Sequence, residues 1–413
     1  MQMKTNTLLL SLLAFALPAG AAWTNTSGTT YSDGVWQIDR KTTGAIKLLN
    51  PADAAAAAAA GYVLDLSGLD EDFPGLFTQI QENGDLSCKA QMTKIVLPAS
   101  CTNILNGTFN GWTSLREVVV STNLLGIGNT AFQNCSALET VYPAGTPNPT
   151  AGTVLLPPSL ASFAGWGAFL NCSSILAVEA PGVTNVENRV FAGCTALRSV
   201  SLSPALAALK SNNAWNNSVF YNGTADAAFV DFSPSVWTPA FSTLQTGAFA
   251  MTAVTNLFDL SACTALSAIP ARAFYGTSVA GATFPASVRT FGEYAFAGLS
   301  RGATFTFLGD VPSFEAAYAD HAPFYPAAAN DPSTRHVFVA DAASFPAWTN
   351  AATFVALADF GTNATVSAAF GTGSPDYPGS RTLGVTLLGS GNGRYAWLVQ
   401  YDPVPDAVYL MFE

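Results

Sequence analysis

The chain has 413 residues, which is enough to bury a large hydrophobic core. Only 10% of the residues are charged and 49% are hydrophobic, a composition that excludes a largely disordered chain. The formal net charge is −11 and the 16 Lys and Arg residues form no run, so a nucleic-acid partner is not expected.

Residues 1–22 have the pattern of a signal peptide. Lys4 precedes the apolar run LLLSLLAFAL, and the small residues AGAA that follow fit cleavage after Ala21 or Ala22. The run is shorter than the roughly 20 apolar residues that cross a bilayer, and no later segment is long and uncharged enough. A buried N-terminal helix is the alternative. We expect a secreted or cell-surface protein without a transmembrane segment in the mature chain.

Residues 23–85 are predicted to form an N-terminal cap that shields the first coil of a repeat array. The stretch YSDGVWQID indicates a turn followed by an alternating strand. The alanine run DAAAAAAAG predicts two helical turns, with Asp53 as N-cap and Gly61 as C-cap.

A spacing of apolar residues recurs after the cap. In NTAFQNCSALETV and NRVFAGCTALRSV, a Phe is followed by Cys after three residues, Leu after six and Val after nine. The same spacing starts at Phe109 and Phe169, and weaker copies start at Phe220, Phe249, Phe274 and Phe296. Most neighbouring copies lie 22 to 29 residues apart, which is the period of a leucine-rich repeat.

The best copy, IGNTAFQNCSALETVYP, resembles the BspA-like leucine-rich repeats of bacterial surface and secreted proteins. The resemblance implies a leucine-rich-repeat solenoid, a right-handed coil lined by β-strands with short irregular convex segments. Residues 86–352 are assigned to the repeats, with insertions at 143–156 and 211–239. Residues 353–413, which read as about three strands joined by turns, are assigned to a small C-terminal β module or end cap.

The spacing has a physical explanation in such a coil. Leu and Val point inward from one strand of each coil, Phe closes the opposite wall, and stacking of neighbouring coils buries a continuous core. Cys135, Cys172, Cys194 and Cys263 occupy one repeat position that elsewhere holds Trp or Thr, which favours packing over disulfides or metal binding. For Cys88 and Cys101 a local disulfide stays open.

Residues that alternate with the buried strand residues should point outward on the concave face. These predicted contact residues are Glu117, Val119, Thr140, Tyr142, Ala177, Glu179, Ser199 and Ser201. The second insertion adds Trp215, Tyr221 and Trp237 among Asn and Ser residues. Exposed aromatics of this kind contact sugars or proteins, although a loop that packs its own aromatics over the coil is the simpler interpretation.

No catalytic motif is found. His321 and His336 are the only histidines, and the acidic residues Asp70, Glu71 and Asp72 fit a solvated turn better than a calcium loop. We therefore expect no enzyme activity, cofactor or metal, although a hydrolase that uses carboxylates is a third hypothesis. The first is an exported protein-binding or adhesion scaffold, and the second is a carbohydrate-binding module. Either would have a protein or glycan on a cell or host surface as partner; ligand and oligomeric state stay open.

Overall fold

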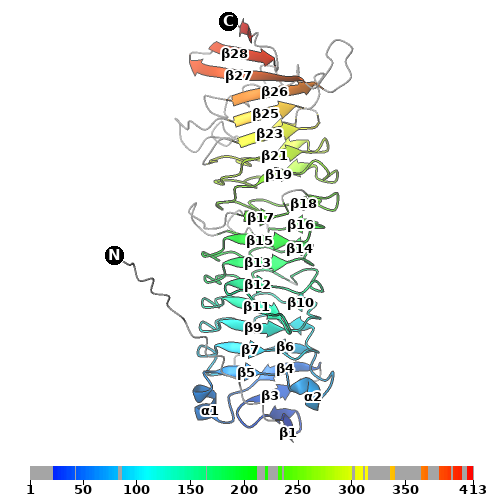
Figure 1. Ribbon diagram of the computed structural model, residues 1–413, viewed down its shortest axis with the longest axis vertical. Helices are drawn as coiled ribbons and strands as arrows, with labels where there is room; N and C mark the ends of the chain where they lie inside the picture. Colours follow the sequence, from blue (N-terminus) through cyan, green and yellow to red (C-terminus); the bar gives the residue numbers. More distant parts are fainter. Residues whose placement is uncertain are drawn as a thin grey trace, which may run out of the picture.

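The described part of the chain forms one long column of stacked coils (Figure 1). The computed structural model describes residues 22–41, 43–81, 86–163, 165–211, 219–221, 231–234, 237–299, 303–309 and 312–314, and the backbone of five strands after residue 334. It is a β-solenoid of about 9 turns with little helix, which confirms the predicted fold class. The predicted signal peptide lies outside the described residues except for Ala22, as does most of the 211–239 insertion, and in the C-terminal module only the backbone of four strands is described.

One side of the column, the strand wall, consists of parallel strands from successive coils. Its lower sheet contains, in spatial order, β5 (Val63–Asp65), β7 (Lys94–Val96), β9 (Glu117–Val120), β11 (Thr140–Pro143), β12 (Thr153–Leu155), β13 (Ala177–Ala180), β15 (Ser199–Leu202) and β17 (Asp231–Ser233). Its upper sheet begins with β19 (Leu257–Asp259), β21 (Gly281–Phe284), β23 (Ala303–Phe307) and β25 (Arg335–Val339). Strand β26 (Ala364–Phe370) pairs with β25 in parallel. Strands β27 (Arg381–Gly391), β28 (Arg394–Tyr401) and β29 (Ala407–Phe412) then extend the sheet in antiparallel pairs.

A second side, the short-strand wall, has strands of two to four residues. They form three groups: β4 (Ala45–Leu48), β6 (Gln79–Gln81), β8 (Asn103–Ile104) and β10 (Gly126–Ile127); β14 (Asn185–Val186), β16 (Ala208–Leu209) and β18 (Thr243–Leu244); and β20 (Ala268–Ile269), β22 (Thr290–Phe291) and β24 (Ser313–Phe314). Within each group the strands pair in parallel.

The third side, the turn wall, carries the repeated phenylalanines. Their rings stack from coil to coil with centroids 4.7–5.9 Å apart, and each ring is at most 4% exposed. The stacked rings are Phe109, Phe132, Phe169, Phe191, Phe220, Phe249, Phe274 and Phe296. Backbone hydrogen bonds such as Phe132 N–H to Ala168 O (2.8 Å) also join the coils here. The inward rows predicted from the repeat are therefore present.

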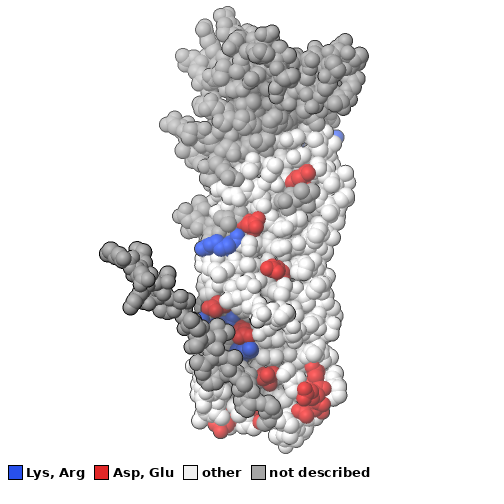
Figure 2. All heavy atoms as spheres, viewed as in Figure 1, with Lys and Arg blue, Asp and Glu red and all other residues white. Residues whose placement is uncertain are grey.

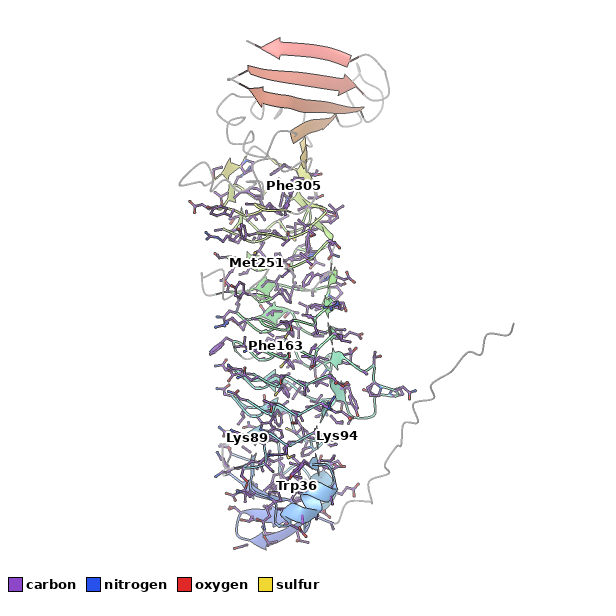
Figure 3. The ribbon with its side chains drawn as sticks, turned by 90° about the vertical axis from the view of Figure 1, so that its left-hand side faces the viewer. Trp36, Lys89, Lys94, Phe163, Met251 and Phe305 are labelled. Carbon is purple, nitrogen blue, oxygen red and sulfur yellow. The ribbon has the colours of Figure 1, made fainter. Side chains whose placement is uncertain are left out.

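The column is nearly straight in both ribbon views, so the strand wall is not the concave face expected from the sequence (Figures 1 and 3). Hydrogen-bonded strands repeat about every 4.8 Å, and the stacked rings of the turn wall repeat every 4.7–5.9 Å.

The lower end is covered by an antiparallel meander. Strands β1 (Thr24–Ser27), β2 (Thr30–Ser32) and β3 (Gln37–Arg40) pair in sequence and lead into β4. In helix α1 (Ala54–Ala59), Asp53 accepts hydrogen bonds from the N–H groups of Ala55 and Ala56, and Gly61 follows the helix with φ +68°. Trp36, labelled in Figure 3, is 3% exposed and its indole donates to Val63 O (2.9 Å). The meander thus closes the core below the first coil.

All six cysteines are free thiols. In the repeat position, Cys135 Sγ donates to Phe109 O (3.0 Å) and Cys172 Sγ to Phe132 O (3.0 Å), so each thiol is bonded to the backbone of the coil below. Burial raises the pKa of Cys135 and Cys194 to about 12 and holds that of Cys172 well above its usual value. Cys88 and Cys101 are not bridged. The cysteines are therefore packing residues of the repeat.

Candidate binding face on the strand wall

The register of the strand wall aligns its outward side chains into two rows. The first outward row is Val63, Lys94, Glu117, Thr140, Thr153, Ala177, Ser199 and Asp231. The second outward row is Asp65, Val96, Val119, Tyr142, Leu155, Glu179, Ser201 and Ser233. Every strand residue predicted to point outward lies on one of these rows. The structure therefore brings residues from eight strands onto one surface.

Three of these residues form a polar network. Lys94 Nζ lies 2.7 Å from Glu117 Oε1, and the Tyr142 hydroxyl donates to the same oxygen at 2.5 Å. The side chains of Lys94 and Glu117 are 28% and 34% exposed, so both are partly shielded from water. Burial, and then the hydrogen bond and charge of Glu117, hold the pKa of Tyr142 well above its usual value. The tyrosine is therefore neutral and held in one orientation.

Apolar side chains adjoin this network on the second outward row. Val96, Tyr142 and Leu155 are half-buried, and Val119 is 7% exposed. Further along the row, Glu179, Ser201 and Ser233 are exposed and polar. The face thus has an apolar part beside Lys94, Glu117 and Tyr142 and a polar part above it.

Strand β12 is the part of this face that the sequence did not predict. It lies within the 143–156 insertion and pairs with β11 on one side and β13 on the other. The connection from β11, residues 144–151, is almost entirely exposed. The insertion therefore adds one strand to the wall, and with it Leu155 to the apolar part of the face.

Charged groups on the viewed side of the column are few, and the acidic ones gather mainly towards its lower end (Figure 2). Beside the polar network, Arg116 Nη1 and Glu139 Oε1 form an exposed ion pair of 2.8 Å. Exposed pairs of this kind contribute little to stability. A partner for this face would therefore be recognised by shape and hydrogen bonds more than by net charge.

Of the aromatic contacts predicted in the second insertion, Trp237 and Tyr221 do not lie on this face. Trp237 is 2% exposed and packs against Phe241 with ring centroids 4.1 Å apart, so it is not a surface contact and agrees with the alternative of a loop that packs its own aromatics. Its large apolar ring fills the core instead. Tyr221 is half-buried on the turn wall, where its carbonyl accepts the Gly193 N–H (2.9 Å). Trp215 lies outside the described residues.

Trp166 is an exposed aromatic that sequence reasoning missed. It is 41% exposed, whereas the other tryptophans whose side chains are described are at most 4% exposed. It sits three residues before Phe169, where the neighbouring coils have Asn129 and Asn188. That break in the repeat pattern was the available signal.

The acidic residues singled out near the cap have structural partners. Asp70 Oδ2 accepts the Ser100 N–H (3.0 Å), and Asp72 Oδ2 accepts the Trp23 N–H (2.7 Å). They belong to helix α2 (Leu69–Asp72). Over the described ranges, no group of three His, Cys, Asp or Glu residues is arranged to hold a metal ion. No helix of the described chain has the length and apolar character to cross a membrane.

Comparisons with solved structures show resemblances at low identity. A leucine-rich repeat protein from Bacteroides ovatus is 13% identical with a TM-score of 0.36, and the match covers 74% of this chain and 93% of that one. The pneumococcal vaccine antigen PcpA is 11% identical with a TM-score of 0.34, over 80% of this chain and 96% of that one. The T. pallidum leucine-rich repeat protein is 20% identical with a TM-score of 0.28, over 41% and 82%. No curated protein matches the sequence.

The model of the BspA-type leucine-rich repeat region matches residues 72–146 and 164–302 in six copies, more than half of the chain. The matched segments contain the stacked phenylalanines and most of the strand wall. The chain therefore belongs to the BspA-type leucine-rich-repeat family.

Proposed function

We propose that this protein is an exported, non-enzymatic scaffold that binds a partner protein through the outer face of the strand wall. The observation that carries the proposal is the alignment of eight strands into two continuous outward rows. Such rows present side chains at fixed spacing, so a partner can contact several coils without ordering the face first. A scaffold or binding role agrees with the family.

The centre of the binding face is proposed at Tyr142. Tyrosine is enriched among residues that dominate binding energy, because it combines a large apolar ring with a hydroxyl group. Here Glu117 fixes the hydroxyl, and Val119 and Leu155 flank the ring on the same row. The other proposed contact residues are Thr140, Ala177, Glu179, Ser199 and Ser201.

Export is supported by the leader pattern of residues 1–22, and placement on the cell surface or in the medium follows from it. The partner is then a protein on a cell or host surface, and adhesion is the proposed consequence. The net charge of −11 argues against nucleic acid as the partner.

Binding of the labelled, purified chain to host cells tests the proposal. Tyr142→Ala and Leu155→Glu should each reduce binding at least tenfold, because both change the proposed centre of the face. Tyr275→Ala is the matched control, since Tyr275 is also half-buried but lies on the turn wall. Equal binding by all three variants would exclude the strand wall as the contact surface.

The alternative function is a carbohydrate-binding module. Of the three aromatic residues proposed for it, Trp237 is buried and cannot contact a sugar. Trp166 is the exposed indole that such a module would use within the described residues. A glycan that stacks on it should change the part of the tryptophan emission that Trp166→Phe removes. No change across a panel of host and plant glycans would exclude sugar binding at this residue.

A further inference from the structure

The strand pairing of two walls stops at the same level of the column. The lower sheet of the strand wall ends at β17 and the upper sheet begins at β19. The short-strand wall ends one sheet at β18 and begins the next at β20. Because β17 leads into β18 and β19 into β20, both interruptions separate the same two coils. We call this level the seam.

Pro270 accounts for one bond that is missing from the short-strand wall at the seam. In four coils, the residue four positions before the stacked Phe donates its N–H to the coil below, as in Gln245 to Leu209 O (3.1 Å) and Gly292 to Ile269 O (2.8 Å). The residue four positions before Phe274 is Pro270, which has no N–H. The bond that would reach Leu244 is therefore missing.

In the strand wall, a side chain occupies the position of the backbone ladder. Asn256 Oδ1 accepts the Phe232 N–H (3.0 Å), and Asn256 Nδ2 donates to Asp231 Oδ1 (3.4 Å). Strands β17 and β19 thus meet through an amide side chain, and a backbone bond from Trp237 to Asp259 O (3.0 Å) lies beside it. A side-chain bridge holds the two strands less rigidly than a ladder, because its torsions are free to rotate.

The turn wall stays intact across the seam. Gly247, Phe249 and Met251 donate their N–H groups to Ala271, Ala273 and Tyr275 at 2.7–3.0 Å. The rings of Phe249 and Phe274 remain stacked at 5.2 Å, and Trp237 lies 5.6 Å from Phe258. The two parts of the column are therefore joined along one side and through the aromatic core.

The other interruption of the short-strand wall is different. That wall also stops after β10 and continues from the bridge between Ser162 and Asn185, but there the strand wall runs through β11, β12 and β13 without a break. Within the described ranges, the seam is the level at which both walls stop together.

We propose that the seam divides the column into two cooperative units that open about the turn wall as a hinge. The stability of a solenoid is approximately a sum of repeat terms and neighbour terms, so cooperation should be weakest at the level where both sheets are interrupted. The lower unit ends at β18 and the upper unit begins at β19. All proposed contact residues of the binding face belong to the lower unit, although the division does not depend on that function.

Hydrogen exchange of the full chain at increasing urea concentration tests the division. Peptides from 177–209 report on the lower unit and peptides from 268–291 on the upper unit. Because both sheets are interrupted at the seam, exchange rates in the two sets should differ by about tenfold or more at intermediate urea. If both sets exchange together at every urea concentration, the column is one unit and the proposal is wrong.

A second experiment restores the backbone N–H group that Pro270 lacks. Pro270→Ala should protect the new amide at position 270 and bring the two urea transitions closer together, whereas Asn256→Ala should move them apart. Pro181→Ala is the matched control, because it releases a similar amount of unfolded-chain entropy at an exposed turn away from the seam. If Pro270→Ala and Pro181→Ala shift the transitions equally, Pro270 does not cause the seam.

Discussion

Phe132 and Phe169 stack with ring centroids 4.9 Å apart and ring planes 6° apart, although 37 residues separate them in the chain. The chain between them contributes β11, β12 and the exposed connection at 144–151 before it returns to the turn wall. Ring stacking therefore sets the coil register even where an insertion interrupts the repeat. Figure 3 shows Phe163 of this coil among the side chains that fill the column.

Phe132→Ala should lower the free energy of unfolding by about 3–5 kcal/mol, because it leaves a cavity between two stacked rings. Urea denaturation followed by circular dichroism measures the change. Leu125→Ala is the control, since Leu125 is 57% exposed and its truncation should change stability by less than about 0.5 kcal/mol. A small effect of Phe132→Ala would mean that the rings are not part of a packed core.

Thiol labelling should separate the cysteines by burial. Only the thiolate reacts, and burial raises the pKa of Cys101, Cys135 and Cys194 to about 12, so these thiols stay protonated at pH 8. Cys88, which is half-buried, should react first with iodoacetamide in the native protein. Mass spectrometry of the labelled peptides checks the order. Labelling of Cys172 before Cys88 under native conditions would contradict the packing.

The repeat and its inward residues were predictable because their spacing is regular and their environment is local. Phe, Leu and Val recur at fixed offsets, so in stacked coils they all point into the same core. Because side chains alternate along a strand, Glu117 and Tyr142 then point outward. The network between them was not predictable, because it joins two different coils through side-chain conformations. Strand β12 was missed because Thr153–Leu155 follows a turn-rich segment that gives no periodic signal.

The burial of Trp237 in the second insertion could not be predicted from the repeat spacing either. Trp237 lies among Ser and Pro in a segment that departs from the repeat, so spacing gave no inward or outward assignment. Its contacts with Phe241 and Phe258 depend on how the coil closes around the seam. Pro270, in contrast, can be read from the sequence. Its effect on the short-strand wall becomes clear only once the structure shows which residue of a coil donates its N–H group to the coil below.

A left-handed backbone position two residues after each ring should favour Asn or Gly. Asn134 and Asn171 have φ +62° and Gly193 has φ +72°, whereas Met251 adopts φ +56° at the same position. Since non-glycine residues other than Asn and Asp strain there, Met251→Asn should raise the free energy of unfolding by about 0.5–1 kcal/mol. Gly193→Ala should lower it, because a Cβ would lie 2.2 Å from Asn171 Oδ1. Urea titrations of both variants check the two signs.

The mature chain should begin at Trp23. Ala22 is exposed, whereas Trp23 is 4% exposed and its N–H lies 2.7 Å from Asp72 Oδ2. Cleavage after Ala22 would turn that N–H into an ammonium group and the hydrogen bond into an ion pair. N-terminal sequencing of the exported protein decides between the two predicted cleavage positions. A chain that starts at Ala22 would contradict this expectation.

Tyr142 should ionise at higher pH than an exposed tyrosine. Burial raises its pKa most, and the hydrogen bond and charge of Glu117 raise it further. The unfolded chain loses this proton near pH 10 and the folded chain only above that, so the stabilisation is complete below about pH 10 and is lost as the pH rises. Absorbance at the phenolate band, taken as the difference between the native chain and Tyr142→Phe, follows the titration. Glu117→Gln should move this pKa down towards 10, and an unchanged titration in that variant would show that the Glu117 contact does not act on Tyr142.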